Sequence, residues 1–393
     1  DVRFLFFPLP VRQQPPRPLK ASAFILFAGV TLVAAAPTHA QFPTYPAADR
    51  VLGAPGFATA GSGAATPSEL MDPFGLAIDP AGGKLFVSAS GQHRVMRFRS
   101  ATSLANGENA EAVFGQVNFS GTGRGTTATA LDFPVGLHVD GNGRLWVADS
   151  RNNRVLMFEG ASMLPGFGSI PDRVFGQPDF TTVSPGTTAR KMNNPSHAIV
   201  DAEDNLWVAD YSNHRVLKFA NVSSLASGAA AMVVLGQGDF TSSTYGTNEA
   251  QMMGPARLAA DGAGHLWVAD VWNNRVLRFD DAAALGNQAT ASGVLGQPDF
   301  TTGDYGSTAQ GMGIPYGLLI DPAGTLFVAD YNNSRVLIFK SAAAKANGAA
   351  ADGVIGQRNL TSGSIPLSPS GRSFDGPTSL AIDGAGRVWE AYQ

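Results

Sequence analysis

The chain has 393 residues, of which 46 are glycine, 15% are charged and none is cysteine. Disulfides and thiolate metal sites are therefore excluded, while the length allows a sizeable core. The formal net charge is −4, and residues 1–40 hold four basic residues and one acidic residue, so the remainder carries −7. An acidic domain argues against a nucleic-acid partner and against an anionic membrane surface.

Residues 1–40 have the pattern of a secretory signal peptide. Arg12, Arg17 and Lys20 precede an apolar run over 21–36, and small residues then lead to a cut near Ala40. The run has about 16 residues, fewer than the roughly 20 that span a bilayer, so cleavage is favoured over a membrane anchor. We expect an exported protein (periplasmic, cell-surface or extracellular) with no stable membrane insertion after cleavage.

A hairpin pattern recurs five times along the chain. Each copy is an apolar strand, a polar turn that usually holds asparagine, and a second apolar strand that ends in phenylalanine. Val, Leu, Ile and Phe favour strands, and asparagine tolerates the left-handed backbone of tight turns. The copies begin about 60 residues apart, at Leu85, Leu145, Leu206, Leu266 and Leu326. This fixed period predicts a repeat architecture whose strands are buried on both faces.

Each repeat is predicted to contain four antiparallel strands. A short apolar strand ending in aspartate comes first, the hairpin supplies the next two, and a Val-x-Gly-Gln-x-Asp-Phe segment supplies the fourth. Four such strands per period form the blade of a β-propeller, and blades must stack around an axis to bury their faces. We therefore predict an all-β, six-bladed β-propeller over 41–393. Its complete repeats are expected near 74–115, 134–176, 196–236, 256–296 and 316–356.

The last blade is predicted to be split between the two ends of the chain and to be incomplete. Residues 378–393 supply its inner strands, and 50–57 matches the segment that closes the other repeats, so it becomes the outermost strand. No third strand is expected. Glu390 stands where the other copies have valine, so we expect a buried carboxyl group without a partner, which is costly.

The pattern Pro-x-Gly-Leu-Ala-Ile-Asp, followed by Leu-Trp-Val-Ala-Asp-x-x-Asn-x-Arg-Val-Leu-x-Phe, resembles the NHL repeat family over nearly all of 50–393. Five copies of the hairpin make the resemblance specific. The long period and the Gly-Gln-Pro-Asp-Phe element depart from the shortest members, so longer blade loops are expected. The resemblance implies a six-bladed propeller that usually binds a ligand or a protein, and a minority of members are enzymes.

Polar residues that recur in nearly every repeat are interpreted as structural. Rings of charge around a ligand are the alternative, but a ligand is rarely six-fold symmetric, whereas the needs of a blade are. The aspartate that ends the second strand is expected to bind turn amides, and the arginine that opens the third strand to pair with an acid or a carbonyl. The repeated tryptophans are assigned to the core between blades, and the repeated glutamines to backbone groups near the outer strand.

Function is therefore sought where the repeat is broken. The first strand of each blade is expected to line the axial channel, and two blades replace its usual glycine with His197 and Arg257. His138 is a third departure. Together with Phe74 and Tyr316, these residues are candidates for a ligand site at the mouth of the channel, suited to a small anionic or aromatic ligand.

Two hypotheses follow. The first is a non-enzymatic scaffold, expected to be a monomer, that binds a protein, glycan or small ligand on the face around the channel, without cofactor or nucleic acid. The second is a metal-assisted lyase or hydrolase that uses His138, His197 and Arg257. Lyases of the resembled family hold a metal with three histidines on inner strands, but only His138 and His197 lie on first strands here, at different depths. A divalent metal belongs to the second hypothesis only.

Overall fold

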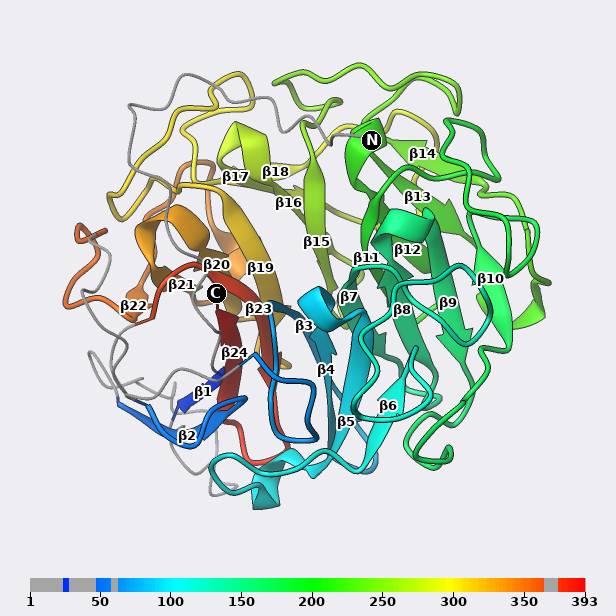
Figure 1. Ribbon diagram of the computed structural model, residues 1–393. Coiled ribbons are helices and arrows are strands. Elements are labelled where there is room, and N and C mark those ends of the chain that lie inside the picture. Colours follow the sequence, from blue (N-terminus) through cyan, green and yellow to red (C-terminus); the bar gives the residue numbers. More distant parts are fainter. Residues whose placement is uncertain (1–23, 28–46, 58–62, 364–373, 393) are drawn as a thin grey trace, which may run out of the picture.

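The computed structural model describes residues 24–27, 47–57, 63–363 and 374–392. Within these residues the chain forms a β-propeller: four-stranded antiparallel sheets stand around a central axis, and helical segments are limited to short 3-10 turns (Figure 1). Five blades are each built from four strands that are consecutive in the chain. This is the all-β repeat architecture that the period predicts.

The strands of the five blades, from the axis outward, follow the chain. They are β3 (Pro73–Ile78), β4 (Lys84–Ala89), β5 (Arg94–Ser100) and β6 (Ala112–Phe114); β7 (Pro134–Val139), β8 (Leu145–Asp149), β9 (Arg154–Phe158) and β10 (Arg173–Phe175); β11 (Pro195–Val200), β12 (Leu206–Asp210), β13 (Arg215–Phe219) and β14 (Val233–Leu235); β15 (Pro255–Ala260), β16 (Leu266–Asp270), β17 (Arg275–Phe279) and β18 (Gly293–Leu295); β19 (Pro315–Ile320), β20 (Leu326–Asp330), β21 (Arg335–Phe339) and β22 (Gly353–Ile355).

Short 3-10 turns join the second and third strands of these blades. They are η1 (Ser90–Gln92), η3 (Ser150–Asn152), η4 (Tyr211–Asn213), η6 (Val271–Asn273) and η8 (Tyr331–Asn333). Each turn ends on a residue in the left-handed conformation, such as Asn153 with φ 54°, as the asparagine-rich turns predict. Further turns follow the third strand: η2 (Ala101–Ser103), η5 (Val222–Ser224), η7 (Ala282–Ala284) and η9 (Ala342–Ala344).

The fourth strands are shorter than the sequence pattern suggests. Each has three residues, and the glycine that follows it turns the chain with a positive φ, 83° at Gly115 and 87° at Gly236. Only glycine adopts this conformation without strain. The Gln-x-Asp-Phe part of the predicted fourth strand is therefore a loop.

The hydrophobic core is divided among the seams between neighbouring blades. In one seam, Trp146 and Phe175 of one blade pack against Leu206 and Leu217 of the next. The hairpin strands β8, β9, β12 and β13 are buried along their whole length. Both faces of each sheet are thus covered, as predicted from the continuous apolar runs.

A further four-stranded sheet combines segments from both ends of the chain, with the order β2-β1-β24-β23. These strands are β2 (Ala48–Leu52), β1 (Phe24–Phe27), β24 (Val388–Tyr392) and β23 (Pro377–Ile382). The outer strand is the predicted N-terminal segment, although it spans Ala48–Leu52 rather than residues 50–57. The position at which we expected no strand is occupied by β1, which pairs antiparallel with both β2 and β24.

β1 lies inside the segment that the sequence predicts to be a signal peptide. An open edge of β24 presents unpaired backbone N–H and C=O groups, and any extended segment can satisfy them. Backbone groups make this pairing, so the residues of β1 need not follow the repeated hairpin pattern, and the pattern does not predict the strand.

The innermost strands surround the axis. In order, β3, β7, β11, β15, β19 and β23 each contact the next, and β23 contacts β3 (Figure 1). Since every innermost strand starts with proline at the same end, residues near their starts meet around one mouth of the axial channel.

Candidate functional site

All five residues proposed from the sequence lie on innermost strands. Phe74 is on β3, His138 on β7, His197 on β11, Arg257 on β15 and Tyr316 on β19. Four of them are brought together near the starts of their strands. His138 lies further along its strand, where it pairs with Trp146.

Arg257 crosses the axis of the propeller. Its Nη1 donates to the carbonyl of Ser196 on the neighbouring strand at 2.9 Å, and its Nη2 donates to the carbonyl of Phe74 on β3. Since β3 and β15 are not neighbours in the ring, the side chain bridges opposite walls and closes the channel. Its guanidinium carbon also lies 5.6 Å from the centre of the Tyr316 ring.

The guanidinium of Arg257 is a buried cation without a carboxylate partner in the described part of the chain. The residue is 2% exposed, and its Nε has no hydrogen-bond partner in the residues that the structure describes. Burial lowers its pKa to about 10, so the group stays charged at neutral pH. Glycine at position 136 leaves room for this side chain, because a Cβ there would lie 2.7 Å from Nη1 of Arg257.

His197 links three neighbouring strands through its ring. Its Nδ1 accepts the N–H of Leu258 at 3.2 Å, and its Nε2 lies 3.2 Å from the carbonyl of Leu137, to which the neutral Nε2–H tautomer donates. Burial, and then the charge of Arg257, hold the pKa of His197 well below its ordinary 6.5. Because both nitrogens are engaged with backbone groups, His197 acts as a neutral strut rather than as a free ligand or base.

His138 is a separate feature deeper in the channel. Its Nε2 is buried and has no partner among the described residues, and burial lowers its pKa to about 4 although Asp140 opposes the shift. In the described residues, no group of three or more His, Asp or Glu side chains is arranged to hold a metal. His138 and His197 therefore do not form the three-histidine arrangement that the lyase hypothesis requires.

An aromatic collar surrounds the closed mouth. We use this name for Phe74, Phe133, Tyr211, Trp272, Tyr316 and Tyr331, which are all partly exposed. The rings of Phe74 and Phe133 are 5.5 Å apart, and those of Phe74 and Tyr316 are 6.2 Å apart.

Further contacts involve the remaining members of the collar. Tyr316 is followed by Tyr331 at 6.4 Å, and Trp272 Nε1 donates to the hydroxyl of Tyr211 at 2.7 Å. Arg151 lies over Phe133, with 4.3 Å between its guanidinium carbon and the ring centre. The sequence did not point to Phe133, Tyr211, Trp272 and Tyr331, because they lie in loops and turns that vary between repeats. That variation at the turn positions is the signal that could have revealed them.

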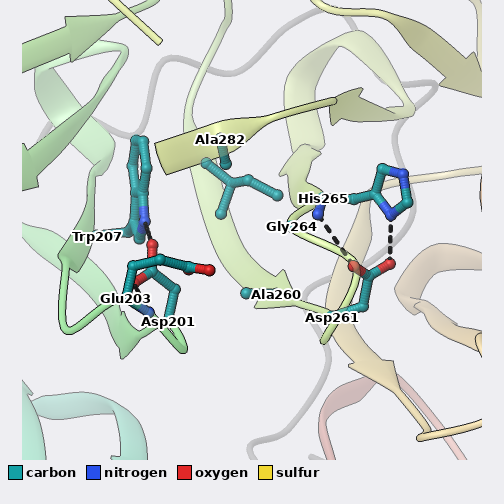
Figure 2. Close-up of a pocket in the computed structure, with 9 residues that line it drawn as sticks. Asp201, Glu203, Trp207, Ala260, Asp261, Gly264, His265 and Ala282 are labelled. Atoms are coloured by element: carbon teal, nitrogen blue, oxygen red, sulfur yellow. Dashed lines mark hydrogen bonds and ion pairs between the residues drawn. The ribbon is translucent and has the colours of Figure 1, made fainter. Parts of the chain in front are cut away.

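A small pocket lies at the opposite end of the strands, between two blades. Asp201 and Trp207 line it from one blade, and Asp261 and His265 from the next (Figure 2). Asp201 accepts the indole N–H of Trp207 at 2.7 Å, and Asp261 pairs with Nδ1 of His265 at 2.7 Å. Equivalent aspartate–tryptophan bonds occur at Asp140 and Asp383. The pocket is therefore the ordinary seam beside the tight turns that the sequence assigned to structure.

The repeated Asp–Arg pairs have the structural role that was predicted. Asp330, for example, accepts a 2.7 Å bond from Nε of Arg335, a bond from Asn333 and one from the backbone N–H of Gly313. Burial raises the pKa of Asp330 to about 6 although Arg335 opposes the shift. The repeated glutamines also bind backbone carbonyls, as Gln177 does with Asn153 and Ser184.

The fold and the repeated hairpin define an NHL-type β-propeller. A family model described as the teneurin NHL domain matches residues 67–340, and the chain belongs to this family. Teneurin-3 of Danio rerio is 24% identical over 290 residues, a match that covers 66% of this chain and 10% of that protein. The chain thus spans about a tenth of the length of this relative.

Two solved structures resemble the chain in fold. A streptogramin B lyase has a TM-score of 0.43 at 10% identity, covering 81% of this chain and 93% of its own. A chain of a nidogen/laminin complex has a TM-score of 0.48 at 13% identity, covering 86% of this chain and 95% of its own. No helix in the described residues is long and apolar enough to cross a membrane.

Proposed function

We propose that this chain is an exported, six-bladed NHL propeller that acts as a monomeric scaffold and binds a protein partner through the aromatic collar. The six blades would be the five consecutive ones and a sixth formed by β2, β23 and β24, from which cleavage near Ala40 would remove the strand β1 that lies between β2 and β24. The closed order of the innermost strands supports this number. Export is supported by the signal-peptide pattern of residues 1–40 and by the acidic remainder.

The observation that carries the proposal is the collar itself. Aromatic rings and arginine are enriched where proteins bind each other, because they bury much apolar area and still offer polar atoms. Here partly exposed rings stand together with the guanidinium of Arg151. Arg257 closes the channel beneath them, so the collar is a surface on which a partner rests rather than an opening through which a substrate passes.

A protein is favoured over a glycan or a small ligand. A small ligand needs a concave site that covers most of its surface, whereas a protein partner can bind a broad surface. The rings also come from several blades, which gives a broad contact area. The resemblance to the NHL repeat family likewise implies ligand or protein binding.

The test compares a collar variant with a matched variant on the periphery. Trp272→Ser with Tyr331→Ser removes two rings, whereas Met163→Ser changes a side chain that is 86% exposed and lies outside the collar. The wild type would be cross-linked to its partners in its own culture and then purified from the exported fraction. The mass of exported protein that was not cross-linked would establish whether residues 1–40 are removed. A partner is then purified and titrated against all three proteins.

We expect a partner whose affinity falls at least tenfold in the collar variant and is unchanged in Met163→Ser. Equal binding by the collar variant would refute the site. A glycan that binds the wild type but not the collar variant would replace the protein partner. A mass that retains residues 1–40 would refute processing and would be consistent with β1 as a permanent strand.

A further inference from the structure

The buried Asp–Arg pair of the blades is complete in four copies. In each, the aspartate at the end of the second strand accepts one bond from arginine Nε, one from an asparagine side chain and one from a backbone N–H. For Asp270 these bonds are 2.7 Å from Arg275, 2.8 Å from Asn273 and 2.6 Å from Met253. The other copies are centred on Asp149, Asp210 and Asp330.

The first blade lacks this aspartate. Ala89 occupies its position and pairs with Arg94, as Asp270 pairs with Arg275. Ala89 and Arg94 are both completely buried, and among the described residues Nε of Arg94 has no hydrogen-bond partner.

The backbone N–H that binds the aspartate in the complete sites also has a counterpart in the first blade. The backbone bond from Gly91 to the carbonyl of Met71 corresponds to the bond from Trp272 to Met253. Met71 is therefore the equivalent of Met253, whose N–H binds the aspartate in the complete site. The described residues offer no aspartate to the N–H of Met71.

The guanidinium of Arg94 nevertheless binds the backbone carbonyls equivalent to those that the arginines of the other blades bind. Arg94 donates to the carbonyls of Thr66 at 3.0 Å and Glu69 at 3.1 Å, as Arg275 does to those of Asn248 and Gln251. Gln92 replaces the asparagine of the other blades, and its Oε1 accepts a 2.7 Å bond from Nη2 of Arg94. All of these partners are neutral, and no carboxylate of the described residues is paired with this buried positive charge.

We propose that the position vacated by the aspartate, in front of Ala89, is a binding site for a small carboxylate anion of the size of formate. Relative to alanine, aspartate adds one carboxylate group, and formate supplies the same carbon and two oxygens. One oxygen would accept from Nε of Arg94 and the other from the N–H of Met71. The nearest acidic neighbour in sequence, Asp72, follows Met71, and its half-buried carboxyl group disfavours anions that carry more than one charge.

The test measures the melting temperature of the full chain during titration with sodium formate, with sodium chloride at equal ionic strength as the reference. A ligand that binds only the folded state stabilises it in a saturable way, and we expect a rise of roughly 1–3 °C beyond that in chloride. Ala89→Asp should raise the melting temperature without formate and abolish the response, because its own carboxylate fills the site.

Asp270→Ala removes the aspartate from a complete site and so creates the proposed anion site in another blade. It should lower the melting temperature and add a second, larger response to formate. A wild type that responds equally to formate and chloride would overturn the proposal, whatever Asp270→Ala does. The proposal also fails if Ala89→Asp keeps the full formate response.

Discussion

Glu390 is the clearest conflict between a residue and its surroundings. It lies on β24 and pairs with Leu380 of β23, as Val328 pairs with Leu318 in the preceding blade. The side chain is completely buried, and neither carboxyl oxygen has a hydrogen-bond partner in the described structure. Burial raises its pKa well above the ordinary 4.5, so the folded protein holds this group protonated.

Glu390→Val should therefore stabilise the protein, and by an amount that depends on pH. A raised pKa in the folded state gives a contribution to stability that is fully present below pH 4.5 and is lost as the pH rises toward the folded-state pKa. The advantage of valine should grow by about 1.4 kcal/mol for each pH unit in this window. Removing an unpartnered buried polar group adds about 1–3 kcal/mol at every pH.

The assay is urea unfolding of wild type, Glu390→Val and Glu390→Gln at several values between pH 4.5 and pH 7.5. Other ionisable groups are shared, so differences between the proteins isolate residue 390. Glutamine cannot ionise, so the difference between the glutamine and valine variants should be flat with pH. Parallel stability profiles for wild type and Glu390→Val would refute the assignment of a buried, protonated carboxyl group.

Two further predictions use matched pairs within the chain. Trp207→Phe should lower the free energy of unfolding by about 1 kcal/mol more than Trp267→Phe, because Trp207 donates to Asp201 whereas Nε1 of Trp267 has no partner among the described residues; equal losses in urea unfolding would contradict this. Gly136→Ala should cost about 1–3 kcal/mol, since its Cβ would lie 2.3 Å from the Ser196 carbonyl, whereas Gly141→Ala, with nothing within 4 Å, should be nearly neutral. Similar melting temperatures for the two alanine variants would show that the channel is less closely packed.

The closed channel changes the interpretation of the residues chosen from the sequence. Arg257 and His197 were selected because they break the repeat, and both do lie at the axis. Most of their polar atoms, however, form hydrogen bonds with backbone carbonyls and amides of neighbouring and opposite strands. The departures from the repeat thus cross the axial channel, and the aromatic collar, which is the proposed partner surface, lies above them.

The amino-acid sequence by itself determined the blade and its internal chemistry. Strand pairing within a blade, the turn that precedes Arg154 and the bonds of Gln177 repeat at a fixed period, and each depends on residues close in the chain. The cost of Glu390 could be predicted in the same way, because five other copies show which residue that position requires.

Only the tertiary structure decided how the blades meet at the axis and at the ends of the chain. Arg257 binds Phe74 across 183 residues, and the collar gathers rings from turns of different blades. β1 joins its sheet through backbone groups, which every residue possesses. Contacts that depend on the curvature of the whole ring, or on the backbone alone, do not require particular residues at the period of the repeat. The repeated sequence pattern therefore cannot predict them.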